Sequence, residues 1–444
     1  MNPSDLAHSR ENKALEALIL RMRDLLVEEE NFRFLNSPKP EIYSFCTPLI
    51  LTREEHENMA KLVELFCQAL EQVGDYLARK RSEARQWLQF SSQLEEEFFF
   101  LDHGFHERLP IRRLDMAMDP QGRMLLMEIN CGCPGGELDP ALVAAAYRKA
   151  SYPQTGRGVF LDPRDESLES ILRCYRQFKR KRPWMPCKPT IALLTSRAQA
   201  HFMLPECRGI AEHYRNRGYR VGVGTLEDLE TQGEALLLKG EPVHLVFRKF
   251  STQSLRLRLE EPSRFDLPEV LGAKLLWESV CAARVCLVNP LGSTFLQDKG
   301  ILELIGRENP ELREYLPETF ILGHRIRAQE PDLFRSILRG HSFVLKKRAS
   351  YGGKHVILDP DDIRRQVPRI LKEEPGKWVA QRRVGFCRKE FVAWDGNMIR
   401  LGAFPFVLSP FGKSAFVRVG LDGRSWIPIN AHAGSAESFL MVEV

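Results

Sequence analysis

The segment RLDMAMDPQGRMLLMEINCGCPGG, residues 113–136, carries the pattern from which the fold is best predicted. Its parts RLDMAMD and RMLLMEIN are strand-like stretches of apolar residues interrupted by polar ones. The Pro-Gln-Gly triplet at 120–122 lies between them and is typical of a turn. We therefore expect two strands side by side, followed by a run of small residues at 131–136.

Four polar side chains of these strands indicate a site for a metal ion and phosphate. Side chains at positions i and i+2 of a strand point to the same face, so Arg113 and Asp115 share a face, as do Glu128 and Asn130. Two carboxylates and an amide oxygen are hard ligands of the kind that Mg²⁺ uses beside substrate phosphates. A guanidinium can hold a phosphoryl oxygen through paired hydrogen bonds. The alternative is a hairpin with surface salt bridges. Either polar pair alone, Arg113 with Asp115 or Glu128 with Asn130, would not exclude it.

The Pro134-Gly135-Gly136 turn makes the metal-site interpretation more specific. We expect it to present exposed backbone N–H groups near the metal site, where such groups can bind an oxyanion. Cys131 and Cys133 are the only close pair of cysteines, and one intervening residue is too short for an ordinary disulfide. Because the sequence has no CxxC pair and no zinc-finger spacing, we expect reduced thiols and a cytoplasmic protein.

A second constellation surrounds Lys346. The apolar stretch Phe343-Val344-Leu345 ends in this lysine, which places an ammonium group at a strand end. Gly352 and Gly353 follow, and such a pair lets a loop approach phosphates through its backbone. The segment is not a P-loop, since GxxxxGK[ST] is absent. A surface hairpin with a glycine turn is the alternative, and Lys347 competes with Lys346 for the phosphate role.

Two further stretches hold candidate nucleotide ligands. In NPLGSTFLQDK, residues 289–299, Lys299 opens a helix from which it could reach nucleotide phosphates. In WVAQRRV, residues 378–384, a strand runs into a segment whose backbone could pair with an adenine edge. Glu390 lies downstream and could accept ribose hydroxyls. An ordinary solvated lysine and a buried strand with polar ends are the respective alternatives.

The rest of the chain divides around these motifs. Residues 10–90 have helical spacing, with a capping-box start at Thr52 and Glu55. The stretches TIALLT and RVGVGT, with a helix between them, indicate a small α/β lobe with a parallel sheet. The basic run RQFKRKR and three prolines mark the boundary before this lobe. We predict a helical region, a metal-binding part, the small lobe and a nucleotide-binding part at residues 1–90, 91–185, 186–290 and 291–444.

Composition restricts the possible classes of protein. The 444 residues exceed what one hydrophobic core usually serves. The formal charge of +5, from 64 basic and 59 acidic residues, is a mild excess that suits an enzyme acting on anions. Despite the pI near 8.6, there is no nucleic-acid-binding motif and no interleaving of aromatic and basic residues. No apolar run is long enough to span a membrane. We therefore expect neither a nucleic-acid partner nor a membrane-embedded protein.

Together these residues resemble the ATP-grasp superfamily, in particular its circularly permuted members related to glutathionylspermidine synthase. In ordinary ATP-grasp ligases the lysine strand and glycine loop come first, and the R-x-D and E-x-N strands come last. Here R-x-D and E-x-N lie near residue 120 and the lysine strand near residue 346, the order of the permuted group. The resemblance covers about residues 90–440. It implies a mixed α/β fold in permuted order, with the small lobe preceding the nucleotide site.

The resemblance also implies roles for individual residues. Asp115, Glu128 and Asn130 match the magnesium ligands, and Arg113 matches the arginine that faces the transferred phosphoryl group. Further matches are the phosphate lysines, the adenine hinge, a late arginine of permuted relatives and a closing turn: Lys299, Lys346, Gln381, Val384, Arg418, Asn430 and Gly434. Glu390 fits the ribose position only loosely, and Ser435 replaces the second glycine of the closing turn.

The implied activity is ATP-dependent ligation. A substrate carboxylate attacks the γ-phosphate of ATP to form an acyl phosphate, and an amine then attacks its carbonyl carbon, giving an amide, ADP and phosphate. ATP and Mg²⁺ are the implied cofactors, and an amino acid, peptide or polyamine is among the small-molecule partners. A phosphotransferase on the same fold and a scaffold without activity are the rivals. Arg248, in VFRKF, could meet a substrate carboxylate or make a structural salt bridge.

Overall fold

A computed structural model of the protein describes most residues of the chain. These are residues 3–29, 33–34, 41–151, 158–323, 326, 329–350, 355–421 and 435–443.

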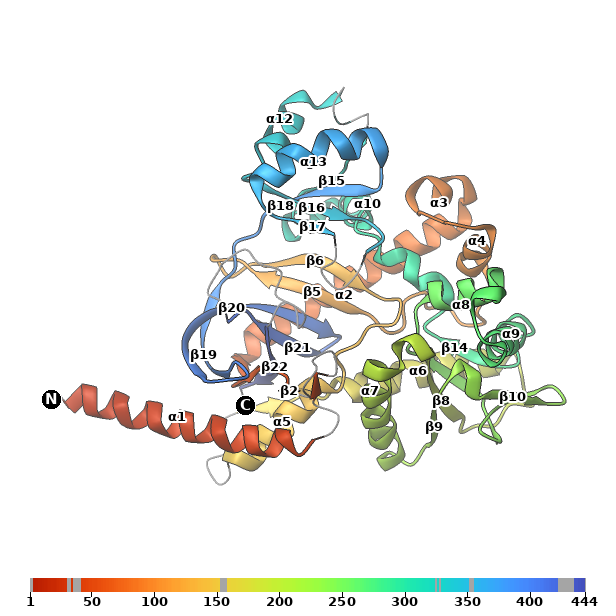
Figure 1. Cartoon of the computed structure of the whole chain (residues 1–444), viewed down its shortest axis with the longest axis horizontal. Coiled ribbons are helices and arrows are strands. Elements are labelled where there is room, and N and C mark those ends of the chain that lie inside the picture. Colours follow the sequence, from red (N-terminus) through yellow and green to blue (C-terminus); the bar gives the residue numbers. More distant parts are fainter. Residues whose placement is uncertain are drawn as a thin grey trace.

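A nine-stranded sheet forms the centre of the molecule (Figure 1). Its main path runs β19-β3-β22-β21-β20-β5-β6, β4 and β7 pair with β22, and an additional β19–β20 pairing closes part of the sheet on itself. The strands are β3 (Phe45–Cys46), β4 (Leu49–Leu51), β5 (Arg113–Met118), β6 (Met124–Asn130), β7 (Val159–Phe160), β19 (Arg388–Trp394), β20 (Ile399–Phe411), β21 (Ser414–Val419) and β22 (Ala436–Val442).

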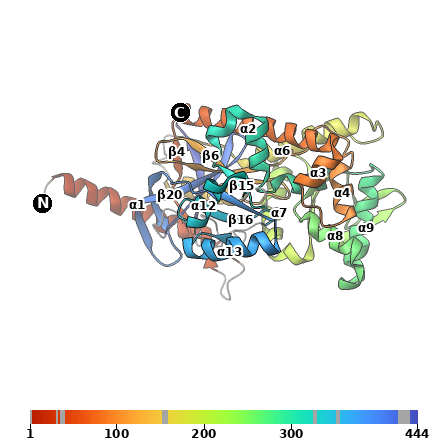
Figure 2. The same ribbon diagram turned by 90° about the horizontal axis from the view of Figure 1, so that it is seen from above.

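Helices from the first 100 residues pack on different parts of the molecule, and the second of them shares the core of this sheet. They are α1 (Pro3–Val27), α2 (Arg53–Arg79), α3 (Arg81–Trp87) and α4 (Gln93–Phe100). The predicted capping box is present at the start of α2, where the Thr52 hydroxyl accepts from the Glu55 N–H and the Glu55 carboxylate accepts from the Thr52 N–H. The short strands β3 and β4, which pair the N-terminal region with the central sheet, were not predicted from the sequence. Helix α1 packs on α5 (Asp139–Ser151), and its N-terminal end projects from the body (Figures 1 and 2).

The predicted small lobe has the expected parallel sheet. Its order is β14-β13-β8-β9, and all three pairings are parallel. The strands are β8 (Thr190–Thr195), β9 (Arg220–Thr225), β13 (Leu245–Arg248) and β14 (Cys286–Val288). The helices of this part are α6 (Pro163–Arg180), α7 (Arg197–Asn216), α8 (Thr252–Glu260) and α9 (Leu267–Cys281). A small antiparallel sheet adds β10 (Leu229–Gln232), β11 (Ala235–Leu238) and β12 (Glu241–Pro242).

The lysine strand belongs to a separate antiparallel sheet with the order β15-β18-β16-β17. Its strands are β15 (Thr319–Ile321), β16 (Phe343–Lys347), β17 (Val356–Ile357) and β18 (Trp378–Arg382). Nearby helices are α10 (Ile301–Glu308), α12 (Pro331–Arg339) and α13 (Pro360–Glu373). Leu345, Val367 and Ala380 are fully buried between this sheet and its helices. In Figure 1 this unit stands above the β5–β6 hairpin.

The architecture confirms the predicted mixed α/β fold and the inverted order, since the β5–β6 hairpin precedes the lysine strand β16 along the chain. Among the placed residues, no helix combines the length and apolar character needed to cross a bilayer.

Candidate active site

The β5–β6 hairpin places the four predicted polar side chains as the sequence analysis expected. The strands are antiparallel, with Arg113 opposite Asn130 and Asp115 opposite Glu128. Leu114, between the two polar residues of β5, is fully buried and packs in the same core as α2. Because strand side chains alternate between faces, this burial turns the polar residues to the other face.

Asp115 is the centre of a dense group of hydrogen bonds. Its Oδ1 accepts from Arg113 Nε at 2.9 Å and from Ser409 Oγ at 2.9 Å. Its Oδ2 accepts from Asn130 Nδ2 at 3.1 Å and from Arg418 Nη2 at 2.9 Å. Burial by itself would raise the pKa of Asp115, but Arg113 and Arg418 outweigh it and hold that pKa well below its usual value. Asp115 is therefore ionised at neutral pH.

Arg418 and Ser409 reach this group from neighbouring strands. Arg418 lies on β21 and Ser409 on β20, and Arg418 Nη2 also donates to Ser409 Oγ at 2.9 Å. Sequence reasoning found Arg418 through the family resemblance and missed Ser409. The sequence feature that could have indicated Ser409 is its hydroxyl group within the otherwise apolar run FPFVLSPF of β20.

Glu128 and Lys299 form an ion pair that connects the hairpin to the entrance of α10. Lys299 Nζ lies 3.1 Å from Glu128 Oε1 and donates to the Ser350 carbonyl oxygen at 2.5 Å. The Lys299 side chain is 4% exposed and that of Glu128 is 28% exposed. The predicted phosphate lysine is thus buried beside a predicted metal ligand, and it is not a solvated surface residue.

Lys346 and Lys347 point in different directions. Lys346 Nζ donates to Gln381 Oε1 at 2.6 Å, whereas Lys347 Nζ pairs with Glu374 at 2.7 Å. Burial lowers the pKa of Lys346 to about 8, an effect opposed by the charge of Glu128. The placement favours Lys346 over Lys347 as the lysine directed to the site.

The other predicted nucleotide ligands differ in whether they contact the residues around Lys346. Gln381 is 3% exposed, and its Nε2 donates to Thr319 Oγ1 at 3.1 Å and to the Met127 carbonyl at 3.4 Å. Val384 is half-buried just after β18. Glu390 is exposed on β19, and no hydrogen bond or ion pair joins it to the other candidates in the part of the chain described. Gly352, Gly353, Asn430 and Gly434 lie outside the described residues.

The Pro134–Gly136 turn differs from the prediction of an oxyanion site. Its Gly136 N–H donates to Glu206 Oε1 at 3.0 Å, and the following Glu137 N–H donates to the same oxygen at 3.3 Å. A carboxylate of the protein thus already occupies these donors. Lys249, which is fully buried at the end of β13, donates to the Pro134 carbonyl and to Glu137 at 2.9 Å each. These contacts anchor the turn to the small lobe.

Arg248 does not have the role that the sequence suggested. It is fully buried and donates to backbone carbonyl oxygens, among them Gly132 at 2.7 Å and Phe250 at 2.8 Å, and to hydroxyl groups. Neither a substrate carboxylate nor a salt bridge explains its burial. Its guanidinium N–H groups donate mainly to backbone carbonyl oxygens where the hairpin meets the small lobe.

The predicted metal ligands fit Mg²⁺ by donor type. Asn130 gives its Nδ2 to Asp115, and no donor among the described residues is bonded to its amide oxygen. Asp115 accepts from four side chains, so a cation would have to displace at least one of them. The described residues contain no group of three or more His, Cys, Asp or Glu suited to a metal ion. All ten cysteines are free thiols.

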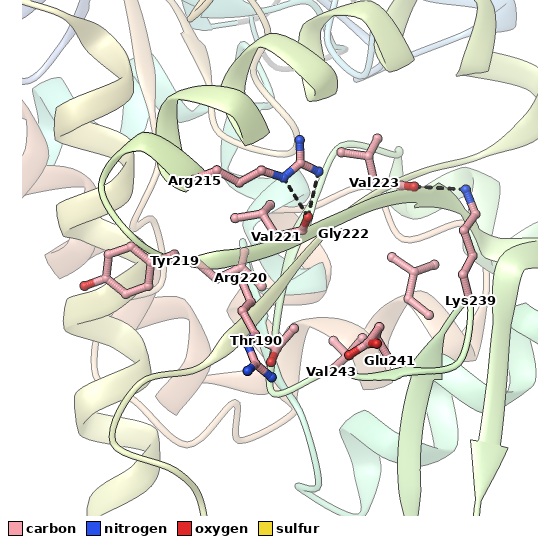
Figure 3. Close-up of a pocket in the computed structure, with 12 residues that line it drawn as sticks. Thr190, Arg215, Tyr219, Arg220, Val221, Gly222, Val223, Lys239, Glu241 and Val243 are labelled. Carbon is pink, nitrogen blue, oxygen red and sulfur yellow. Dashed lines mark hydrogen bonds between the residues drawn. The ribbon is translucent and has the colours of Figure 1, made fainter.

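A cavity of about 630 Å³ lies elsewhere, along strand β9 of the small lobe (Figure 3). The Arg215 guanidinium donates to the Val221 carbonyl at 2.7 Å, and Lys239 Nζ donates to the Val223 carbonyl at 3.1 Å. Both cations thus donate to backbone carbonyl oxygens of β9, an edge strand of the parallel sheet. None of the candidate site residues that the structure places lines this cavity.

Comparisons with known proteins give the family and the fold. The family model described as circularly permuted ATP-grasp type 2 matches residues 48–420. A glutathione synthetase-like effector from Globodera pallida has a similar fold, with a TM-score of 0.61 at 12% identity over 97% of each chain. A putative gamma-glutamylcysteine synthetase from Methylobacillus flagellatus is more distant, with a TM-score of 0.41 at 11% identity over 84% of this chain and 87% of the other. A search of curated proteins gave no match.

The family model spans most of the chain, including both the hairpin and the lysine strand, and the permuted order of those elements is visible in the fold. The chain belongs to the circularly permuted ATP-grasp type 2 family and is an enzyme of the ATP-grasp ligase class.

Proposed function

We propose that the protein is a carboxylate–amine ligase that forms an amide through an acyl phosphate and releases ADP. The observation that carries the proposal is the convergence of two separate units on one site. The β5–β6 hairpin supplies Asp115 and Glu128, and Lys299 and Lys346 meet it from the nucleotide-binding part, with Lys299 Nζ 3.1 Å from Glu128. Two carboxylates facing two lysines suit a site that handles a metal-bound polyphosphate.

Each side chain has a role that follows from its place. Lys346 and Lys299 offset the charge of the phosphates, and Arg113 faces the phosphoryl group during its transfer to the substrate carboxylate. Asp115, Glu128 and Asn130 would hold Mg²⁺, which when bound neutralises phosphate charge. Arg418 keeps Asp115 ionised, with its Nη2 2.9 Å from the carboxylate. Such chemistry depends mainly on positioning and charge, and it requires no side-chain nucleophile.

The adenine and ribose would lie toward β18. Gln381 is fixed by Lys346 and Thr319 at the end of the sheet from which the hinge segment leaves. Val384 in this segment would pair with the adenine edge through its backbone. Glu390 would accept the ribose hydroxyls from β19 of the central sheet, whereas Gln381 lies on β18 of the other sheet.

Calorimetry of ATP binding, with and without Mg²⁺, tests the proposal. The wild type should bind ATP with an affinity that depends on Mg²⁺. Glu128→Ala should lose that dependence because it removes a carboxylate ligand. Glu373→Ala, which changes an exposed glutamate on α13, is the matched control and should behave as the wild type. If ATP binds to none of these proteins, the ligase assignment fails.

A further inference from the structure

The open end of the β5–β6 hairpin is closed by a side chain from another part of the chain. The paired residues of the hairpin end at Arg113 and Asn130, and Ile111 and Cys131 lie buried just beyond this pair. Asn289 Nδ2 donates to the Ile111 carbonyl oxygen at 2.6 Å and to the Cys131 carbonyl oxygen at 2.8 Å. Its Oδ1 accepts from the Ile111 N–H at 2.9 Å. One amide group thus joins both strands and satisfies buried backbone groups there.

Asn289 is itself fixed by the small lobe. It is 1% exposed and directly follows β14, an edge strand of the parallel sheet. Arg248, at the end of the neighbouring strand β13, donates from Nε to the Asn289 carbonyl oxygen at 3.1 Å. The same guanidinium donates from Nη2 to the Gly132 carbonyl oxygen at 2.7 Å. The small lobe therefore holds both the backbone of Asn289 and the segment that leaves β6.

The segment from Asn289 to Lys299 continues along the end of β6. Gln297 Oε1 accepts from the Gly132 N–H at 3.1 Å, and Lys299 Nζ lies 3.1 Å from Glu128 Oε1. From the sequence, a role in this segment was predicted for Lys299 alone. In the structure the first residue of the segment joins the two strands of the hairpin, and the last residue pairs with a proposed metal ligand.

Asn289 reaches the candidate active site through the backbone. Within the described part of the chain, no hydrogen bond joins its side chain to a proposed metal ligand. Asn130 directly precedes Cys131, so Asn289 holds the carbonyl group of the residue next to a proposed ligand. The Asn130 side chain in turn donates to Asp115 Oδ2 at 3.1 Å. Groups that bond to the surroundings of a metal ligand commonly set its orientation.

We propose that Asn289 is a positioning residue of the candidate active site, which sets the place of Asn130 opposite Arg113 by joining the ends of their strands. This inference rests on the proposed function, because its effect is on the binding of Mg²⁺ together with ATP. Without the amide, the two strand ends lose their shared partner, and Asn130 loses a fixed position beside Asp115. Small displacements of positioned groups have large effects on such sites.

Calorimetry on the full chain tests this role, with a non-hydrolysable ATP analogue titrated in the presence and absence of Mg²⁺. The ratio of the two affinities is the Mg²⁺ effect. Asn289→Ala should lower the Mg²⁺ effect about tenfold, as do changes to other partners that orient metal ligands. Asn289→Asp should also lower it, since this variant keeps the size of the side chain and the acceptor for the Ile111 N–H but loses the amide donors. It carries the test if Asn289→Ala does not fold.

Asn309→Ala is the matched control. Asn309 is also buried, and its Nδ2 donates to the Ile305 carbonyl oxygen of the preceding helix α10 at 3.3 Å. Its replacement should leave the Mg²⁺ effect as in the wild type.

A double-mutant cycle separates positioning from a general loss of stability. If Asn289 acts through Asn130, Asn289→Ala should change the Mg²⁺ effect little in an Asn130→Ala background, because the ligand that it positions is gone. An equal change in both backgrounds would overturn the inference, as would a wild-type Mg²⁺ effect in the folded variants of Asn289.

Hydrogen exchange of the nucleotide-free protein tests the positioning without a ligand. Asn289→Ala should speed amide exchange in residues 111–117 and 124–132 and leave the β15–β18 sheet as in the wild type. An equal rise throughout the chain would show an effect on global stability alone and would overturn the inference. If the wild type does not bind the ATP analogue in either condition, the proposed function fails. The exchange measurement then decides independently whether Asn289 fixes the hairpin.

Discussion

At the scale of single residues, the site is organised by ion pairs. Asp115 is held by Arg113 and Arg418, and Glu128 by Lys299. Lys346 differs, because its Nζ contacts the neutral amide of Gln381 and burial lowers its pKa to about 8. Among the described residues, no ion pair joins Lys346 to a carboxylate, and a bound polyphosphate would supply an anionic partner.

The pKa of Lys346 makes ATP binding dependent on pH. Because the depressed pKa lies near 8, the free protein loses the Lys346 proton as the pH rises through this value, while phosphate favours the protonated form. ATP affinity should fall by up to about tenfold per pH unit above pH 8. Binding near pH 8 should also take up protons, which calorimetry in buffers of different ionisation enthalpy detects.

Lys347 provides the control for this prediction, because it lies next to Lys346 but pairs with Glu374. Lys347→Met should keep both the pH dependence and the proton uptake, whereas Lys346→Met should lose both. An affinity in Lys346→Met that still falls above pH 8 would assign the titration to another group.

At the scale of elements, two junctions fix the segment that follows β6. Arg248 holds the Gly132 carbonyl, and Lys249 holds the Pro134 carbonyl and Glu137, so the end of β13 clamps the segment from inside the small lobe. The same segment returns to the site, because Arg113 Nη1 donates to the Gly135 carbonyl at 2.8 Å. The clamp thus connects the small lobe to Arg113, the arginine that we propose faces the phosphoryl group.

The buried Lys249–Glu137 pair should show strong coupling in a double-mutant cycle. Lys249→Met leaves two carboxylates without their cation and should cost about 3–5 kcal/mol of stability. Adding Glu137→Leu removes one of these uncompensated charges, so the double variant should be more stable than the sum of the single effects predicts. Denaturant titration of the four proteins gives the coupling free energy. Simple additivity would show that the pair is not a coupled unit.

Much of the fold and part of the site could be predicted from local sequence. The hairpin, the parallel sheet and the lysine strand carry periodic apolar patterns, and the structure has them where expected. Strands β3 and β4 were missed because two or three residues are too few to show a period. Glu206 and Lys249 were missed for a different reason. Tertiary packing alone brings these two residues, far apart in the sequence, within 3.5 Å of each other.

At the scale of the whole molecule, three structural units converge on the β5–β6 hairpin. The small lobe meets it through Arg248 and Lys249, and the nucleotide-binding part meets it through Lys299 and Gln381. Strand β21 of the central sheet brings Arg418. The residues proposed to bind the nucleotide and the metal ion therefore belong to different parts of the chain.

The most direct test of this account follows the oxygen atoms of the acid substrate. The protein would be incubated with ATP, Mg²⁺, 1,4-diaminobutane as the amine, and N-acetyl amino acids labelled with ¹⁸O in their carboxylates, so that only the diamine carries a free amine. A ligase acting through an acyl phosphate should release ADP only when both acid and amine are present, and the released phosphate should carry ¹⁸O. ADP release without an amine, with a phosphorylated product or unlabelled phosphate, would contradict the account.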